Sequence, residues 1–146
     1  MTMIEPLIYE FIVNCSVEHA FNTWTAKIDS WWPKDHRMID GGEITFVLEG
    51  HLGGRITEQA DDGRTAEWGR ITRWDPPHAL EYHWYAASSP DEPTEVQLTF
   101  TDQDGKTMIR IVHRGWDRFE TDAELRRSRN EQGWDGLLDA YQRTVK

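Results

Sequence analysis

His113 is the titratable residue whose position in the sequence most favours a chemical role. It alternates with Ile109 and Ile111 in a predicted β-strand, so its side chain should share their apolar, concave face. A buried imidazole near neutral pH can act as a general acid or base. The same position suits a structural histidine that bonds a backbone carbonyl near the start of the next helix, and we favour this structural interpretation.

The remaining histidines and the single cysteine lack the spacing that metal binding or nucleophilic catalysis needs. The six histidines are His19, His36, His51, His78, His83 and His113. None forms a His-x-x-x-His or Glu-x-x-His pair, and Cys15 is the only cysteine, so we expect no zinc site. There is no Gly-x-Ser-x-Gly elbow, and Cys15 ends a predicted strand, where a small buried hydrophobe is the commoner role. We therefore expect no metal, no cofactor and no catalytic residue beyond the candidate His113.

Composition limits the class of partner. The chain has 146 residues and a net charge of -10, which argues against binding to nucleic acid or to anionic membrane surfaces. We attribute this charge to solubility rather than to an acidic binding face. One cysteine allows no intrachain disulfide, and no apolar run approaches the roughly 20 residues of a membrane span, so we expect a cytoplasmic protein without membrane insertion. The length suits a single domain over residues 1–146, and both a monomer and a homodimer remain open as assembly states.

The pattern of apolar residues predicts one strand, two short helices, six further strands and a long helix. The first strand covers residues 7–16, and the short helices cover residues 17–25 and 26–32, the second ending before Pro33. The later strands are predicted at residues 43–50, 55–59, 65–74, 78–86, 94–101 and 106–115. Successive hairpin-like connections make an antiparallel meander, so the predicted fold class is α+β.

The C-terminal segment, residues 121–146, is predicted to form one long amphipathic helix. Thr121 and Glu124 fit a capping box, in which each side chain bonds a free backbone N–H at the helix start. An apolar stripe follows at steps of three and four residues and consists of Trp134, Leu137, Leu138, Tyr141 and Val145. This stripe predicts that the second half of the helix packs against the sheet.

The first half of this helix lacks large apolar side chains on the same face. Arg127, Asn130 and Gly133 occupy that face instead, which predicts a polar lid over a space beneath the helix. Gly133 lies inside the helix, where glycine costs about 0.5–1 kcal/mol relative to alanine. We expect that the sheet or a ligand approaches Gly133 so closely that no Cβ fits, rather than that the position is merely exposed.

Eight tryptophans are an unusual number for a chain of this length. Large aromatic side chains can fill a core or line a ligand pocket, and some of these tryptophans must fill the core. The residues that we expect to bind a ligand are Trp24, Trp31, Trp32, Phe46, Trp68, Tyr82, Trp84, His113, Asn130, Gly133, Trp134 and Leu137.

Several short motifs occur together in a specific order. They are Ala20-Phe21 with Trp24, Trp31-Trp32-Pro33, Gly53-Gly54-Arg55, Trp68-Gly69-Arg70-Ile71, Trp74-Asp75-Pro76-Pro77, Leu80 with Trp84, Thr94-Glu95-Val96, His113-Arg114-Gly115-Trp116 and Gly133-Trp134. With these motifs, which span about residues 7–143, the chain resembles the SRPBCC superfamily of START and Bet v 1-like helix-grip domains. Within it, the chain resembles the branch named for the activator of the heat-shock protein 90 ATPase. The resemblance implies a curved seven-stranded antiparallel sheet that grips the C-terminal helix around a deep cavity.

The resemblance also implies a function for the cavity. Members of the superfamily bind apolar small molecules or lipids, and some branches catalyse reactions such as polyketide cyclisation. We therefore expect an apolar or amphipathic small-molecule ligand, in a bacterial single-domain member that lacks the N-terminal chaperone-binding domain of the eukaryotic activators. Two alternatives remain. One is a cavity enzyme of the polyketide cyclase or hydrolase type with His113 as acid or base, and the other is an interaction module like the chaperone ATPase activators.

Overall fold

The computed structural model describes residues 4–86 and 89–146 of the chain. Its elements are β1 (Leu7–Val13), α1 (Val17–Trp24), the 3-10 helix η1 (Ile28–Ser30), β2 (Ile44–Leu48), β3 (Arg55–Ala60), β4 (Thr65–Asp75), β5 (Ala79–Trp84), β6 (Thr94–Gln103), β7 (Lys106–Arg114), the 3-10 helix η2 (Trp116–Asp122) and α2 (Ala123–Thr144). The strands and the long helix follow the predicted order.

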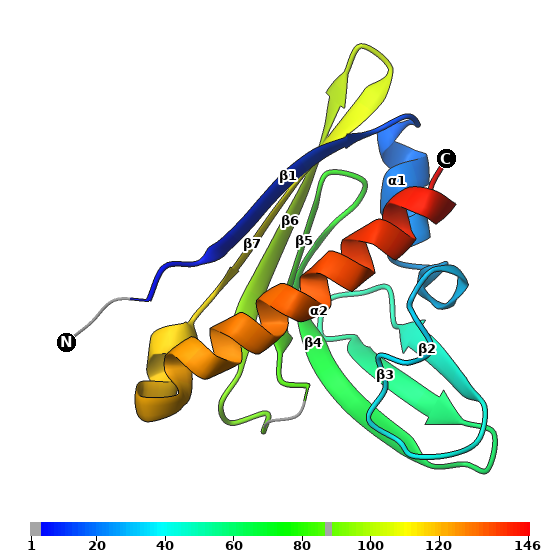
Figure 1. Cartoon of the computed structure of the whole chain (residues 1–146). Helices are drawn as coiled ribbons and strands as arrows, with labels where there is room; N and C mark the ends of the chain where they lie inside the picture. Colours follow the sequence, from blue (N-terminus) through cyan, green and yellow to red (C-terminus); the bar gives the residue numbers. More distant parts are fainter. Residues whose placement is uncertain (1–3, 87–88) are drawn as a thin grey trace.

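The seven strands form one antiparallel sheet in the order β1-β7-β6-β5-β4-β3-β2. Strands β2 to β7 make a meander of hairpins, and β1 completes the far edge by pairing with β7. Figure 1 shows the sheet curving around α2, which crosses its concave side diagonally. The predicted α+β helix-grip fold is confirmed.

Alternation along the strands directs one apolar face of the sheet toward the helix. Leu98 pairs with Ile111 and Phe100 pairs with Ile109 across β6 and β7, and all four side chains are buried. Thr99, which lies between Leu98 and Phe100, is exposed on the convex face. Burying a large apolar side chain stabilises the fold by about 1.5–3 kcal/mol, so this inner face holds the helix through the hydrophobic effect.

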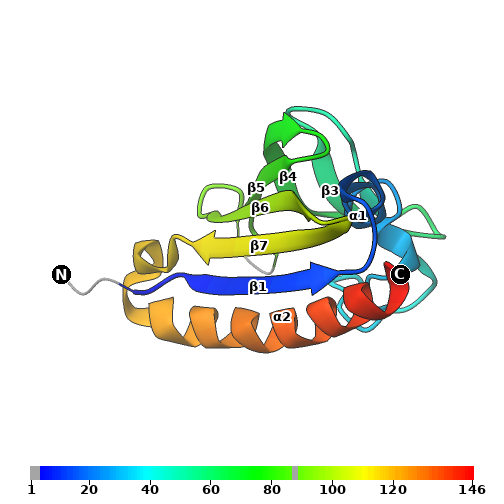
Figure 2. The same ribbon diagram turned by 90° about the horizontal axis from the view of Figure 1, so that it is seen from above.

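The second half of α2 packs against β1 and α1. The ring centroid of Trp134 lies 5.8 Å from that of Tyr9, and the ring centroid of Tyr141 lies 6.3 Å from that of Phe11. Figures 1 and 2 both show α2 running alongside β1. The Tyr141 hydroxyl donates a hydrogen bond of 2.7 Å to the carbonyl oxygen of Ala20, which ties α2 to α1. The predicted apolar stripe is therefore the surface through which the sheet and α1 hold this helix.

The predicted capping box at the start of α2 is wrong. The 3-10 helix η2 precedes α2 directly, and the N-cap residue of α2 is Asp122, whose side chain makes no capping hydrogen bond. Thr121 lies inside the 3-10 segment and not at the first turn of a helix. The cause is Trp116, which is buried and donates its indole N–H to the carbonyl oxygen of His113 at 3.0 Å. This contact starts the helical path several residues before Thr121.

The predicted second short helix, residues 26–32, is also wrong, because only Ile28–Ser30 is helical, as a 3-10 turn. Trp31 and Trp32 are both buried. Their indole N–H groups donate to backbone carbonyls of neighbouring turns, at 2.8 and 3.0 Å respectively. These bonds and the packing of both rings in the core outweigh the local helical pattern.

Tyr141→Phe tests how strongly α2 is tied to α1. The change keeps the buried ring and removes the hydroxyl, so the carbonyl oxygen of Ala20 loses one hydrogen bond. We expect the free energy of unfolding to fall by about 1–2 kcal/mol, measured by chemical denaturation. Arg143→Ala removes an exposed ion pair on the same helix and should leave this free energy nearly unchanged. Equal stabilities of Tyr141→Phe and the wild type would contradict the role given to this bond.

Candidate ligand-binding site

A cavity of about 220 Å³ lies between α2 and the concave face of the sheet. Its wall consists of Trp32, His36, Trp68, Tyr82, Trp84, Ala86, Arg129, Asn130, Gly133, Trp134 and Leu137. Aromatic rings predominate in this wall, and the polar side chains come mainly from α2. The cavity therefore lies where the apolar stripe of the helix is incomplete, as the sequence predicts.

Three tryptophans from different parts of the chain form the wall on the sheet side. The ring centroid of Trp68 lies 5.4 Å from that of Trp32 and 5.3 Å from that of Trp84, both in edge-to-face geometry. Tyr82 continues the row, with its ring centroid 5.9 Å from that of Trp84. Aromatic pairs of this kind stabilise each other by about 0.5–1.5 kcal/mol beyond their burial. The wall is thus held in shape by its own contacts before any ligand enters.

Most of the residues expected to bind a ligand line this cavity, but Trp24, Trp31, Phe46 and His113 do not. The rings of Trp24 and Trp31 lie 4.8 Å apart in the core, and the ring of Phe46 lies 5.9 Å from that of Trp68. The three aromatic residues are buried behind the wall and support the residues that line it.

His113 connects α2 to three strands through a chain of hydrogen bonds. Trp134 donates its indole N–H to His113 Nδ1 at 2.9 Å. An indole can only donate, so Nδ1 is the acceptor and the ring proton is on Nε2, which donates to Thr94 Oγ1 at 2.7 Å. The Thr94 hydroxyl donates onward to the carbonyl oxygen of Trp84 at 3.2 Å. Both ends of this chain, Trp134 and Trp84, line the cavity.

This geometry leaves His113 no nitrogen for acid–base chemistry. Both ring nitrogens have partners, and the side chain is fully buried. Burial lowers the pKa of His113 from 6.5 to about 3, so the ring is neutral at neutral pH. The contacts agree with the structural interpretation, although the ring's partner is a threonine hydroxyl and not the expected backbone carbonyl.

A buried carboxylate anchors the loop beside the cavity, residues 33–43. Glu58 on β3 is fully buried. Its oxygens accept hydrogen bonds from the backbone N–H groups of Met38 at 2.5 Å and Ile39 at 2.8 Å. The same carboxylate accepts the indole N–H of Trp68 at 2.7 Å. One side chain therefore fixes both the loop and a tryptophan of the cavity wall.

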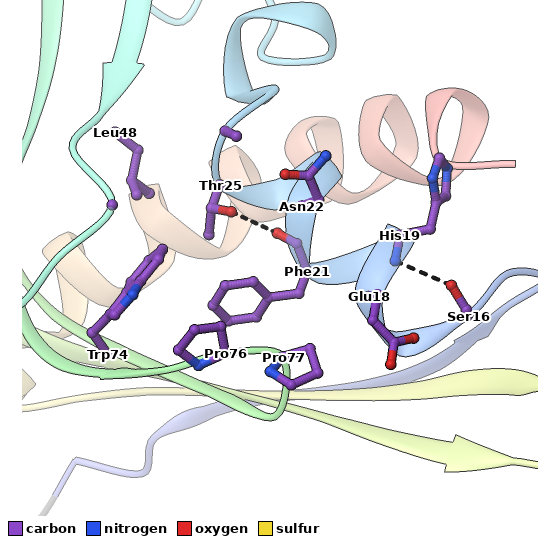
Figure 3. A pocket seen from close by; sticks show the side chains of 12 residues that line it. Ser16, Glu18, His19, Phe21, Asn22, Thr25, Leu48, Trp74, Pro76 and Pro77 are labelled. Carbon is purple, nitrogen blue, oxygen red and sulfur yellow. Dashed lines mark hydrogen bonds between the residues drawn. The ribbon is translucent and has the colours of Figure 1, made fainter.

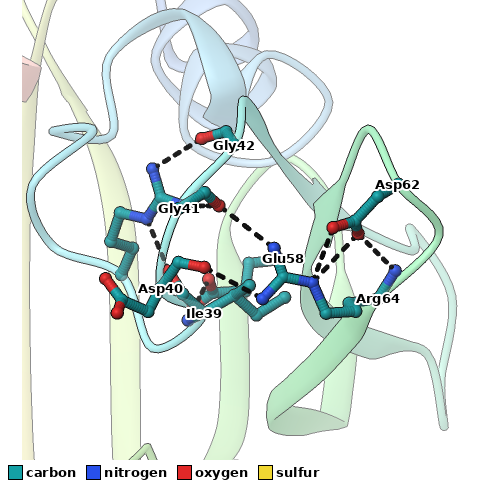
Figure 4. A network of polar contacts seen from close by, with 8 residues as sticks. Ile39, Asp40, Gly41, Gly42, Glu58, Asp62 and Arg64 are labelled. Carbon is teal, nitrogen blue, oxygen red and sulfur yellow. Dashed lines mark hydrogen bonds and ion pairs between the residues drawn. The ribbon is translucent and has the colours of Figure 1, made fainter.

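A second anchor holds the same loop from outside. Arg64 donates to the carbonyl oxygens of Asp40 at 2.9 Å and Gly41 at 3.3 Å, and it pairs with Asp62. Figure 4 shows these contacts beside Glu58. Arg37 adds further bonds to carbonyls of the loop itself. The loop that carries His36 to the cavity is thus bound on both its inner and outer sides.

His36, Arg129 and Asn130 are the polar residues of the cavity wall that keep contact with solvent, so they mark its mouth. Asn130 is oriented by a hydrogen bond from its amide to the carbonyl oxygen of Arg126 at 2.9 Å. Arg127, which the sequence places in the lid, instead donates to a backbone carbonyl of the N-terminal segment at 2.7 Å. The lid prediction is therefore corrected at this position, because Arg129 and not Arg127 lines the cavity.

Gly133 lines the cavity without crowding. A Cβ atom at this position would meet no atom within 4 Å. The expected close approach of the sheet is therefore wrong. The missing side chain instead leaves space beside the helix, which adds to the volume available to a ligand.

A larger depression of about 870 Å³ lies between α1 and the turn that joins β4 to β5. Figure 3 shows Phe21 pointing from α1 toward Pro76 and Pro77, with Trp74 beside them. The ring centroids of Phe21 and Trp74 are 5.2 Å apart, so these two side chains pack against each other. The depression is more open to solvent than the cavity under α2. Small-molecule sites enclose most of their ligand, which favours the smaller cavity.

Within residues 4–86 and 89–146, no group of three or more histidine, cysteine, aspartate or glutamate side chains could hold a metal ion. No helix in the described part of the chain is long and apolar enough to cross a membrane.

The model of the family described as "Activator of Hsp90 ATPase homolog 1-like protein" matches residues 14–146. The chain belongs to this family. The resemblance to the activator branch is therefore confirmed. No curated protein matches the chain.

Solved structures with this fold resemble the chain over nearly its whole length. Txn09, an anthrahydroquino-gamma-pyrone synthase in complex with SUM, is 28% identical with a TM-score of 0.64, and the match covers 100% of both chains. CalC, a self-sacrificing resistance protein from Micromonospora echinospora, is 25% identical with a TM-score of 0.68, over 97% of this chain and 94% of that one. The Aha1 dimer of Colwellia psychrerythraea is 15% identical with a TM-score of 0.67, over 97% and 96%, and shows likeness of fold alone.

His113→Gln tests whether the imidazole is buried and neutral. Its pKa of about 3 in the folded protein lies below the ordinary value of 6.5, so the unfolded chain binds the proton more readily. Stability should therefore fall as pH drops through this window, by up to about 1.4 kcal/mol per pH unit from this group. We expect the free energy of unfolding of His113→Gln to be lower at neutral pH by about 1–3 kcal/mol, because Trp134 and Thr94 lose well-aligned hydrogen bonds. It should also show a flatter loss of stability in acid. Denaturation at several pH values measures both effects, and an unchanged slope would contradict the burial.

Gly133→Ala tests the space beside α2. The substitution adds helix propensity and restricts the unfolded chain without meeting any atom within 4 Å, so we expect a gain of about 0.4–1 kcal/mol in unfolding free energy. Gly136→Ala is the matched control on the same helix, because its Cβ would lie 3.1 Å from the His36 ring. Its gain should be smaller, or become a loss. The reverse order of the two variants in chemical denaturation would show that Gly133 is crowded after all.

Proposed function

We propose that this protein binds a small, largely apolar molecule of one or two rings in the cavity beneath α2. The observation that carries the proposal is the partly enclosed, largely aromatic wall of that cavity. Tryptophan and tyrosine faces offer large apolar contact areas to flat molecules. The polar side chains at the mouth can then fix the ligand's orientation, as in most small-molecule sites.

The volume of the cavity limits the size of the ligand. An apolar cavity of about 150 Å³ can hold benzene, whereas sites for drug-sized molecules usually have about 300–1,000 Å³. The volume of this cavity, about 220 Å³, lies between these two values. We therefore favour a compact ring compound over a long-chain lipid.

The related structures support a small-molecule role without naming the ligand. One relative is described as a synthase in complex with a compound, and another is described as a resistance protein. The fold therefore occurs in proteins of more than one activity. For this chain, the occupied nitrogens of His113 favour binding over a reaction that uses His113 as acid or base.

A neutral aromatic probe, 1-naphthol, tests the proposal. We expect saturable binding to one site with micromolar affinity, about -8 kcal/mol, accompanied by quenching of tryptophan emission. Fluorescence titration and calorimetry measure both. Absence of saturable binding to the folded protein would contradict the proposed function.

A pair of variants tests whether the probe binds in this cavity. Gly133→Leu should fill the space beneath α2 and weaken binding by at least about tenfold, because a leucine side chain replaces ligand volume. Ser128→Leu adds the same side chain at an exposed position of α2 that does not line the cavity, and it should bind like the wild type. Equal binding by both variants would place the probe elsewhere.

A further inference from the structure

We propose that the ligand of this cavity is a flat aromatic acid that carries a hydrogen-bond acceptor at its opposite end. The proposal rests on the proposed function and adds the polar groups that the cavity would recognise. Two residues of the wall carry it. Tyr82, which is buried, and Arg129, which is exposed to solvent, both line the cavity.

The Tyr82 hydroxyl offers a proton inside the cavity. The residue is only 3% exposed and lines the space. Within the described residues, the Tyr82 hydroxyl donates no hydrogen bond, so its proton is available to an acceptor in the cavity that this side chain lines.

Burial keeps this group in the form that donates. It raises the pKa of Tyr82 far above neutral, so the side chain stays a hydroxyl. A buried donor without an acceptor is costly, and a ligand carbonyl at this point would satisfy it. The inner end of the cavity is therefore suited to an acceptor on the ligand and not to a second hydrocarbon group.

Arg129 supplies a cation at the mouth. Three other arginines of α2 are engaged: Arg126 lies 4.2 Å over an aromatic ring, Arg127 bonds backbone carbonyls, and Arg143 pairs with a carboxylate. Among the side chains that the structure describes, Arg129 forms no ion pair, and it borders the cavity. A guanidinium can bind a carboxylate through two parallel hydrogen bonds.

The acidic composition of the protein bears on which charged ligands the cavity can admit. The protein carries a net charge of -10, which repels anions unless a local positive group attracts them. His36 and Asn130 also line the cavity and add further hydrogen-bonding groups. A ring compound with a carboxylate would thus place its rings against the tryptophans and its charge at the solvent side.

A matched pair of probes tests the mouth. The anion 2-naphthoate and the neutral 2-naphthamide have nearly the same shape, so the ratio of their affinities, and its dependence on salt, reports mainly the charge. We expect the wild type to prefer 2-naphthoate by about three- to tenfold at low salt, and this preference should shrink as salt is added.

Two arginine variants separate a local contact from a general change of charge. Arg129→Ala should abolish the preference for 2-naphthoate and leave the affinity for 2-naphthamide unchanged. Arg126→Ala removes the same charge one turn earlier on α2, away from the cavity wall, and should keep the preference. Loss of the preference in both variants would indicate only the overall field and would overturn the assignment to Arg129.

A second pair of probes tests the inner end. The neutral molecules 1-tetralone and tetralin differ mainly by one carbonyl acceptor. Tyr82→Phe should weaken 1-tetralone by about three- to tenfold and leave tetralin unchanged. Equal effects on both molecules would overturn the role of the hydroxyl.

The neutral probes separate failure of this inference from failure of the proposed function. If neither tetralin nor 2-naphthamide binds the folded wild type, the cavity is not a ligand site and both proposals fall. If both neutral probes bind but 2-naphthoate is not preferred, the proposed function stands and the aromatic acid is wrong.

Discussion

The hydrogen-bonded chain from Trp134 through His113 and Thr94 to the backbone of Trp84 is the constraint on which the rest depends. It joins α2, β7, β6 and β5 in one line, and each donor in it has one acceptor. A buried polar group that loses its partner costs about 1–3 kcal/mol, so no member can move alone. The role of His113 at the cavity is therefore structural, because its hydrogen bonds fix Trp134 of the helix relative to Trp84 of the sheet.

The cavity exists because α2 is held firmly over only part of its length. Tyr9 and Phe11 of β1 pack on its second half, while Gly133 leaves space nearer its first half. Filling that space would add dispersion contacts and stabilise the protein. Proteins commonly forgo such stability where function needs the site. Glu58 also supports the cavity. Its buried carboxylate holds the loop and Trp68 at the edge of the space.

The sequence predicts the parts that depend on periodicity. Alternating residues locate the strands and place His113 beside Ile111 on the inner face, and the stripe of α2 predicts both its packed half and the space beneath the other half. Tertiary contacts decide the rest. The buried ring of Trp116 starts the helical path early, and no local pattern shows it. The loop that carries His36 is held beside the cavity by Glu58, which is distant from the loop in the sequence. A helical face also spans a wide angle, so the pattern alone does not separate Arg127 from Arg129.

The proposed function requires that ligands enter the aromatic cavity beneath α2 and not the open depression beside α1. Nuclear magnetic resonance of the tryptophan indole N–H groups tests it most directly, with each signal assigned by a Trp→Phe variant. During titration with 1-naphthol, the signals of Trp68, Trp84 and Trp134 should shift through the ring current of the bound probe, because all three line the cavity. The signal of Trp74, which lines the depression beside α1, should stay in place. A shift of the Trp74 signal with the other three unmoved would show that the probe binds beside α1 and not beneath α2.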